Sequence, residues 1–260
     1  MNARVVSGVI LAAAALAAIL FLPFTALRVL VCLIAGLAAV EYVRITGNTS
    51  AISRLLVVVT VVWVCWWSAV PAPLSPPIVT ILLLAWLAFT VLSEARSVQQ
   101  AAVDAVAPFY IGCPLGMLVA LHMAVGPKGP LLVIATIAVS DSAQYYTGRA
   151  FGRRPLAPTI SPKKTVEGAI GGVIIGTAFM AAAIAYLFPA TPVFVSVLLG
   201  LVIVFVGIIG DLFESRLKRL ADMKDSSTLI PGHGGVLDRI DALLFAIPVF
   251  YFTVLQGRVA

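Results

Sequence analysis

Charged residues are scarce in this sequence. Only 11% of its 260 residues are Asp, Glu, Lys or Arg, and 62% are hydrophobic. Soluble domains carry about 25% charged residues, so the composition excludes an ordinary soluble domain and indicates a membrane protein. The net charge of +6 is not a sign of nucleic-acid binding, because the basic residues are distributed by membrane topology.

Histidine and cysteine are also rare. Cys32, Cys65 and Cys113 each stand alone in an apolar run without CxxC spacing, so they indicate neither a zinc site nor a disulfide framework. We expect them to pack against other helices or lipid, and we expect His122 to be structural. The first apolar run follows a single cation, Arg4, and precedes no soluble domain, so we predict a transmembrane helix there and not a signal peptide.

Long apolar runs make up most of the chain. A helix needs about 20 apolar residues to cross the roughly 30 Å of bilayer hydrocarbon. We therefore predict an all-α, polytopic integral membrane protein with about nine transmembrane helices. It would form one domain over residues 1–260, with N-terminal spans in 1–130 and the chemically active half in 131–260. The predicted spans are 5–22, 29–43, 55–70, 77–92, 105–125, 130–147, 168–188, 193–213 and 236–255.

The basic residues predict the orientation of the chain. If the N-terminus lies in the cytoplasm and nine spans alternate, the cytoplasmic segments hold 14 Lys or Arg residues and the opposite segments hold 3. This imbalance satisfies the positive-inside rule. We predict a cytoplasmic N-terminus, an external C-terminus, and two large polar segments, around 149–164 and 216–239, on the cytoplasmic face.

Acidic residues gather in the second half of the chain, which holds eight of the eleven. Asp211 ends one apolar run, Asp238 begins the next, and Asp241 follows one turn later. Because a carboxylate inside a span is costly, Asp211 should face a cavity or a cation. We expect its helix to continue to Leu220, with Glu214 on the same helical face.

Consecutive antiparallel helices would bring Asp211 and Asp238 to the same membrane depth. Two carboxylates there suit Mg²⁺, which prefers oxygen ligands and substrate phosphates. An open alternative is that these carboxylates are solvated and neutralise Arg219 and Arg239.

A glycine-rich segment, Pro-Gly-His-Gly-Gly at 231–235, lies between the two aspartates. Glycines allow close approach of the backbone to a ligand and can expose N–H groups to an anion. His233 could donate to a phosphate or orient a carboxylate. An ordinary turn is the alternative interpretation.

The earlier polar segment contains Ser161-Pro162 followed by two lysines. Ser161 with proline next predicts a helix N-cap and first helical position. Lys163 and Lys164 would then lie in the first turn, where free N–H groups and cations together form an anion site. The lysines could instead be simple cytoplasmic anchors. Asp141 ends a span, so we expect a functional role for it.

The run Ser215-x2-Lys-Arg-x4-Lys-Asp-x5-Pro-x-His-Gly-Gly-x2-Asp-Arg-x-Asp241 resembles the signature of phosphatidate cytidylyltransferases (CDP-diacylglycerol synthases). The segment Ser-Pro-Lys-Lys-Thr-x-Glu-Gly at 161–168, with Asp141 upstream, is similar to that family's second conserved region. The resemblance is strong over 141–241 and only compositional before it. Val166 and Gln144 depart from the family pattern without removing a charge.

The resemblance implies that CTP and phosphatidic acid yield CDP-diacylglycerol and pyrophosphate, with Mg²⁺ required. It implies a metal site on Asp211 and Asp238, a second cation (K⁺ or Mg²⁺), and a homodimer. No nucleic-acid partner is expected. The implied location is a multi-pass protein of a bacterial cytoplasmic membrane with its active site on the cytoplasmic side. The residues expected to act in catalysis are Asp211, Asp238, Lys218, Arg219 and His233, and those expected to bind substrate are Asp141, Ser161, Lys163, Lys164, Lys224, Asp225, Gly234, Gly235, Arg239 and Asp241.

Other function classes fit less well. An ion-coupled transporter would use similar carboxylates, but its site would lie near the bilayer midplane. A transferase that acts on CDP-activated lipid would carry an Asp-Gly-x2-Ala-Arg run, which is absent. A non-catalytic scaffold leaves the concentration of charge unexplained.

Overall fold

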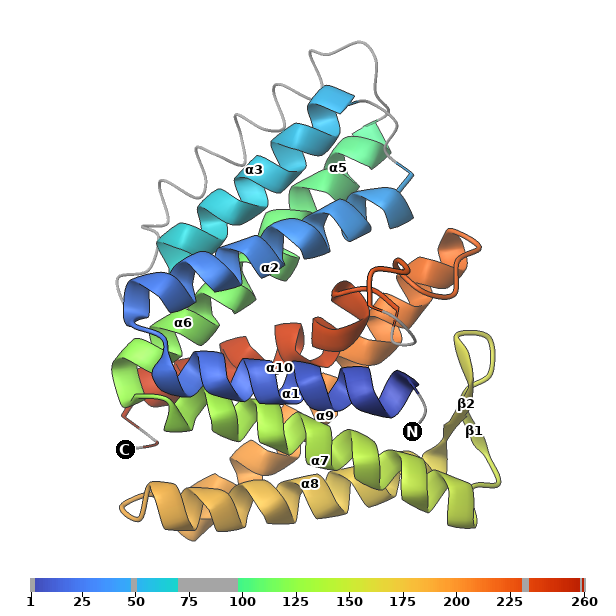
Figure 1. The fold of residues 1–260 in the computed structure, drawn as a ribbon. Coiled ribbons are helices and arrows are strands. Elements are labelled where there is room, and N and C mark those ends of the chain that lie inside the picture. The colour runs from blue at the N-terminus through green and yellow to red at the C-terminus, as the bar shows by residue number, and fades with distance from the viewer. Residues whose placement is uncertain (1–2, 48–50, 70–97, 231–233, 258, 260) are drawn as a thin grey trace. The chain divides into compact units, whose positions relative to one another are not determined.

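Helices account for most of the fold (Figure 1). The computed structural model describes residues 3–47, 51–69, 98–230, 234–257 and 259. The predicted span 77–92 and His233 lie outside these residues. The helices are α1 (Ala3–Phe21), α2 (Phe24–Ile45), α3 (Ala51–Ser68), α5 (Val98–Ala107), η1 (a π-helical turn, Pro108–Gly112), α6 (Cys113–Val125), α7 (Lys128–Phe151), α8 (Val166–Leu187), α9 (Val193–Leu220) and α10 (Leu237–Leu255), and the strands are β1 (Pro155–Ala157) and β2 (Ser161–Thr165).

The helices have the length and hydropathy of a multi-pass membrane protein. Within the described ranges, five helical segments are long and apolar enough to cross a bilayer: 24–45, 51–68, 99–125, 166–187 and 193–220. Each of the eight predicted spans that falls in the described part of the chain overlaps a helix. The helix of Asp211 continues to Leu220, as predicted.

The chain divides into two compact units. Residues 1–123 and 221–239 form the first unit, and residues 124–220 and 240–260 form the second. The 221–239 segment, which carries most of the later polar motif, therefore belongs with the N-terminal helices.

In the first unit, α2 and the continuous α5–η1–α6 helix pack against α3 (Figure 1). A Cβ on Gly112 would lie 2.7 Å from the carbonyl oxygen of Val61, so only glycine permits this approach of backbones. The thiols of Cys32 and Cys65 are free and buried, with their sulfur atoms 3.7 Å apart. They fill the core, as expected. The ring of His122 contacts the Ile19 carbonyl at 3.0 Å, a polar partner that the sequence did not reveal.

In the second unit, α8 packs closely against α7 and α9. Gly168, Gly172 and Gly176 recur every four residues and form one face of α8. Cβ atoms there would approach Gln144 and Ser140 of α7 closer than ordinary contact. This seam of small residues allows the two backbones to come together.

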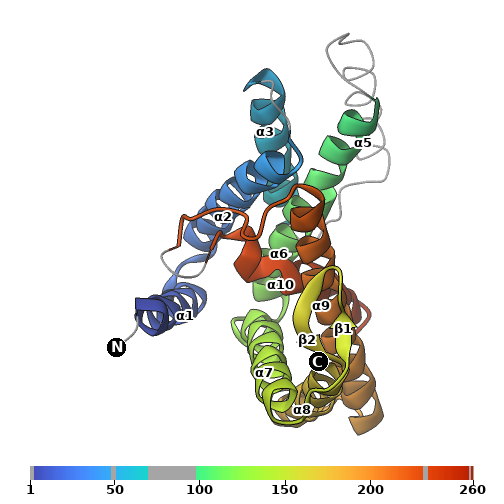
Figure 2. The same cartoon turned by 90° about the vertical axis from the view of Figure 1, so that its right-hand side faces the viewer.

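The strands form an antiparallel hairpin that contacts α7 and α8 (Figure 2). The prediction that Ser161 caps a helix was wrong, because Ser161–Thr165 is strand β2. Thr165, with extended φ −116° and ψ 153°, is the N-cap of α8, and its Oγ1 accepts a hydrogen bond from Gly168 N at 3.1 Å. Pairing of β2 with β1 keeps the residues before Thr165 extended. Lys163 and Lys164 therefore lie before α8 and not in its first turn.

Candidate functional site

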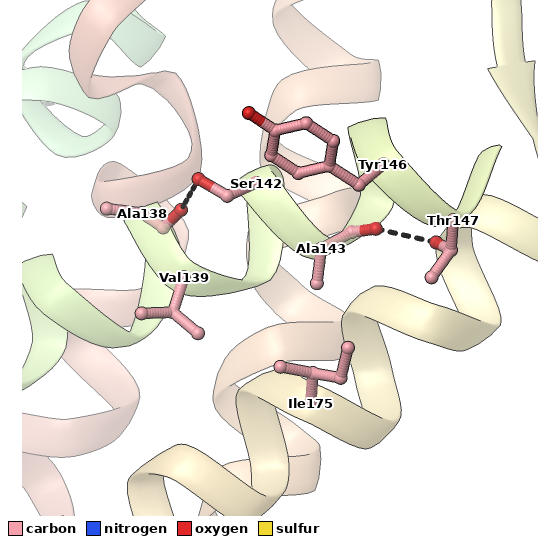
Figure 3. Close-up of a pocket in the computed structure, with 7 residues that line it drawn as sticks. All are labelled: Ala138, Val139, Ser142, Ala143, Tyr146, Thr147 and Ile175. Carbon is pink, nitrogen blue, oxygen red and sulfur yellow. Dashed lines mark hydrogen bonds between the residues drawn. The ribbon is translucent and has the colours of Figure 1, made fainter. Parts of the chain in front are cut away.

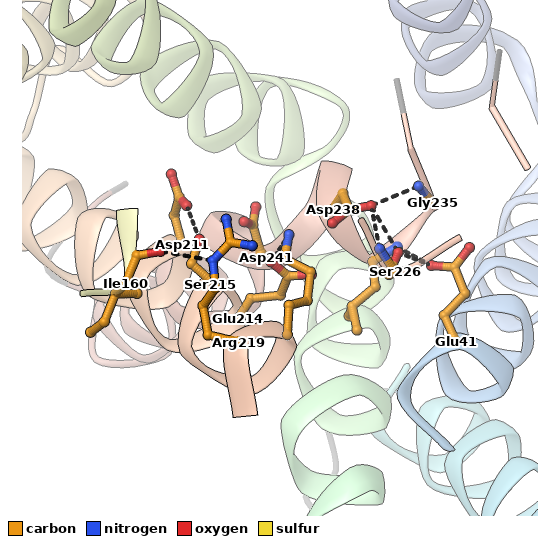
Figure 4. A network of polar contacts seen from close by, with 12 residues as sticks. Glu41, Ile160, Asp211, Glu214, Ser215, Arg219, Ser226, Gly235, Asp238 and Asp241 are labelled. Carbon is orange, nitrogen blue, oxygen red and sulfur yellow. Dashed lines mark hydrogen bonds and ion pairs between the residues drawn. The ribbon is translucent and has the colours of Figure 1, made fainter. Parts of the chain in front are cut away.

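Three aspartates from different helices of the second unit lie close enough to influence one another electrostatically. The charge of Asp241 on α10 interacts with those of Asp211 on α9, Asp141 on α7 and Lys164 on β2. We call Asp141, Asp211 and Asp241 the aspartate cluster; Figure 4 shows Asp211 and Asp241. A hard divalent cation prefers carboxylate oxygens, and one or two of them suffice when water and substrate phosphates complete its shell.

A glycine brings α9 and α10 together at the aspartate cluster. A Cβ on Gly210, the residue before Asp211, would lie 2.7 Å from the carbonyl oxygen of Asp241 and 3.2 Å from Cα of Ala242. Only the absence of a side chain permits this contact between backbones. The glycine therefore lets the backbone of α9 next to Asp211 lie directly against the backbone of α10 at Asp241.

The hairpin contributes a cation to the aspartate cluster. Lys164 forms an ion pair with Oδ2 of Asp211. The Ser215 hydroxyl lies 3.4 Å from the other oxygen, Oδ1. Near the hairpin turn, the Arg219 Nε donates to the carbonyl of Ile160 at 3.2 Å (Figure 4). Lys164 and Arg219 thus hold the hairpin against the C-terminal part of α9.

Two further predicted site residues have partners within the second unit. Lys218 forms an ion pair with Glu214 at 2.5 Å, four residues earlier on α9. The Glu214 side chain is fully buried, and that of Lys218 is 11% exposed. On α7, Asp141 accepts a hydrogen bond from Gln144 at 3.0 Å, so the residue that departs from the family pattern supports a predicted site residue. Lys163 is exposed on β2.

In the first unit, the Asp238 carboxylate accepts hydrogen bonds from residues that precede α10. Its Oδ2 accepts hydrogen bonds from Ser226 N at 3.0 Å, Ser226 Oγ at 2.9 Å and Gly235 N at 2.7 Å (Figure 4). Gly234 has a φ of +81°, in the left-handed region that favours glycine. Lys224, Asp225 and Arg239 are exposed along the same segment. Asp238 lies in the first turn of α10, at the start of the helix as predicted.

Glu41 of α2 is a member of this arrangement that the sequence analysis missed. It is only 5% exposed, and its carboxylate accepts hydrogen bonds from both Ser226 Oγ at 2.9 Å and Ser227 Oγ at 2.7 Å. An ionisable residue near the end of an apolar run is itself a functional signal. That signal was available in the sequence, where the N-terminal half otherwise offers little polar chemistry.

The predicted metal ligands lie in different units, Asp211 in the second and Asp238 in the first. Their pairing stays a prediction. Over the described ranges, no three His, Cys, Asp or Glu side chains form a site that could hold a metal by themselves. Mg²⁺ commonly takes one or two carboxylates and completes its shell with water and substrate phosphates.

An apolar groove lies along α7 in the second unit (Figure 3). It has a volume of about 440 Å³ and is lined by residues 138, 139, 142, 143, 146 and 147 of α7 together with Ile175 of α8. The hydroxyls of Ser142 and Thr147 donate to carbonyls of their own helix, at 2.8 Å and 2.6 Å. The groove therefore presents mostly hydrocarbon and suits an apolar molecule better than a nucleotide.

Comparison with known proteins identifies the family. Residues 2–256 match the model of the Cytidylyltransferase family. The chain is 44% identical over 128 residues to the phosphatidate cytidylyltransferase of Aquifex aeolicus, covering 49% of this chain and 48% of that protein. The corresponding protein of Haemophilus influenzae is 46% identical over 134 residues, covering 48% of this chain and 46% of that protein.

A longer match extends into the N-terminal half. The phosphatidate cytidylyltransferase of Thermotoga maritima is 34% identical over 191 residues, covering 70% of this chain and 71% of that protein. The chain spans about half the length of the first curated relatives it matches, 48% and 46%. The family model covers nearly the whole chain, and this chain therefore belongs to the cytidylyltransferase family.

Proposed function

We propose that this protein is a phosphatidate cytidylyltransferase, which transfers CMP from CTP to phosphatidic acid and releases pyrophosphate. The observation that carries the proposal is the aspartate cluster with Lys164, in a chain whose described residues include five helices long and apolar enough to cross a bilayer. One substrate is a lipid and the other is a polyanion. A lipid-embedded body with carboxylates and cations in one place suits both.

The donor set fits a divalent cation. Asp211 and Asp238 would hold Mg²⁺, and Asp241 and Asp141 place further negative charge near Asp211. A second cation, K⁺ or Mg²⁺, would bind in the same region. When bound, such an ion neutralises the phosphate charge that develops during transfer.

Basic residues would hold the phosphates of both substrates. Lys164 is paired with Asp211, and its ammonium group would exchange this carboxylate for a phosphate when the nucleotide and its cation bind. Lys163 and Arg219 are exposed on the same unit and could reach an incoming polyanion. The further phosphate-binding candidates are Lys218, Lys224 and Arg239.

The remaining predicted residues would shape the site. His233, Gly234 and Gly235 would line the region of the leaving pyrophosphate, since glycine allows close approach of a phosphate to the backbone. Asp225 would orient a neighbouring basic side chain. Ser161 lies on the hairpin, with Lys164 three residues later on the same strand.

The transfer itself needs little covalent help from the protein. An anionic oxygen of the phosphatidate phosphate attacks the α-phosphorus of CTP in line. The bond from that phosphorus to the bridging oxygen breaks, and its electrons leave with pyrophosphate. The attacking oxygen is already an anion, so no general base is required. Positioning and charge neutralisation by fixed groups then supply most of the rate enhancement.

The membrane arrangement proposed from the sequence is nine spans, a cytoplasmic N-terminus and a cytoplasmic active site in a multi-pass membrane protein. It is supported by 14 Lys or Arg residues on the proposed inner side against 3 on the other. A homodimer is proposed from the family resemblance.

The direct test uses purified protein, radiolabelled CTP, phosphatidic acid in detergent micelles, and Mg²⁺. We expect CDP-diacylglycerol and an equal amount of pyrophosphate. A folded wild-type protein that forms neither product would overturn the proposed function. Asp211→Asn and Asp238→Asn should each reduce turnover at least about 100-fold, because each removes a charge from a metal ligand. Near wild-type turnover in either variant would show that its aspartate is not a metal ligand.

A further inference from the structure

Helix α10 begins without a capping side chain of its own. Its first residue is Leu237, and the three residues before it are Gly234, Gly235 and Val236. None has a side-chain oxygen that could accept the first N–H groups of the helix. Uncapped N–H groups need an acceptor from elsewhere.

Glu41 supplies that acceptor from α2, 195 residues away from Val236 in sequence. Its Oε1 accepts from Val236 N at 2.9 Å, and its Oε2 accepts from Leu237 N at 2.7 Å. The hydroxyls of Ser227 and Ser226 add one bond to each oxygen. A buried carboxylate is tolerated when hydrogen bonds replace its water, and these four bonds do so. They also fix the start of α10 and the 226–227 turn to one point on α2.

Ser226 connects Glu41 to Asp238. Its Oγ lies 2.9 Å from Oε2 of Glu41 and 2.9 Å from Oδ2 of Asp238. A hydroxyl has one proton to donate, so the two carboxylates share it. The orientation of Asp238 therefore depends on where Glu41 holds Ser226.

We propose that Glu41 is a positioning residue for the nucleotidyl transfer. It holds the 226–227 turn and the start of α10 in the arrangement that orients Asp238 toward the cation and nucleotide. Glu41 does not contact substrate, because it is 5% exposed and both its oxygens are engaged by the protein. The inference rests on the proposed function, and it gives α2 of the N-terminal half a specific part in that reaction.

The test is Glu41→Gln as purified full-length protein, with Mg²⁺ binding measured by isothermal titration calorimetry and CDP-diacylglycerol formation assayed over a range of Mg²⁺ and CTP concentrations. Glutamine has nearly the same shape, but its NH₂ group is a hydrogen-bond donor. It would replace one carboxylate oxygen of Glu41 that accepts hydrogen bonds from a serine hydroxyl and a backbone N–H. We expect kcat, or the apparent affinity for Mg²⁺, to fall roughly 10- to 100-fold, as for residues that orient metal ligands.

The matched control is Asp104→Asn. Asp104 is another buried carboxylate of the first unit, and it accepts a hydrogen bond from Gln100 on its own helix at 3.1 Å. This variant should lower the melting temperature without changing the Mg²⁺ dependence. An equal change of Mg²⁺ dependence in both variants would overturn the proposal, because the effect would then reflect general destabilisation.

The outcomes separate the inference from the proposed function. An inactive but folded wild-type protein overturns the function, and the positioning role fails with it. An active wild type with unchanged kcat and Mg²⁺ dependence in Glu41→Gln overturns the positioning role alone. If Glu41→Gln does not fold, Ser226→Ala decides in its place, since it removes only the hydroxyl between the two carboxylates. Wild-type Mg²⁺ dependence in Ser226→Ala would then refute the proposal.

Discussion

The contact between α9 and α10 can be disturbed by a single methyl group. In Gly210→Ala, the new Cβ would lie 2.7 Å from the Asp241 carbonyl oxygen and 3.2 Å from Cα of Ala242. Both are backbone atoms, so the strain cannot be relieved by rotation of a side chain. Ordinary contact requires about 3.4 Å or more, so one helix must move by roughly 0.5–1 Å, at a typical cost of about 1–3 kcal/mol for overpacking.

This displacement falls on two members of the aspartate cluster. Asp211 follows Gly210 directly, and Asp241 supplies the carbonyl that the new methyl group would meet. A misplacement of about 1 Å in an active site can cost roughly 100-fold in rate. We therefore expect Gly210→Ala to fold and to lose about 10- to 100-fold of kcat in the CDP-diacylglycerol assay.

Gly207→Ala is the matched control on the same helix. Its new Cβ would first meet Cδ1 of Ile137 at 2.6 Å, the flexible end of a side chain, and would reach Ala242 only at 3.9 Å. Ile137 can change rotamer, so kcat should stay close to that of the wild type. The reasoning is refuted if Gly210→Ala keeps wild-type kcat, or if the two variants lose activity equally.

Two other perturbations test the basic residues. Lys164→Gln removes the ammonium group proposed to contact a CTP phosphate. It should raise the KM for CTP about 10-fold or more, since a charge-assisted hydrogen bond is worth about 1.5–3 kcal/mol. An unchanged KM in steady-state kinetics would exclude this phosphate contact. Glu214→Gln leaves the Lys218 charge buried and should destabilise the protein by about 3–5 kcal/mol, measured by thermal unfolding. Adding Lys218→Met should restore the melting temperature but not turnover, whereas recovered turnover would assign Lys218 a purely structural role.

The sequence predicted features that depend on neighbours along one helix. The apolar runs predicted the helices. The helical pattern beyond Asp211 correctly predicted that its helix continues to Leu220. Glu214 and Lys218 form an ion pair across four residues of one helical face, a spacing that the sequence displays although we did not predict the pair. The fixed spacing of the motif over 215–241 led to the correct family.

The tertiary structure decided features that depend on distant partners. Ser161-Pro162 has the local pattern of a helix start, but pairing with β1 makes Ser161–Thr165 a strand. That strand lets Lys164 meet Asp211, which lies 47 residues away. Glu41 caps a helix that begins 196 residues later. Helical periodicity carries information over about one or two turns, so a hydrogen bond across such a separation exists only once the helices have packed.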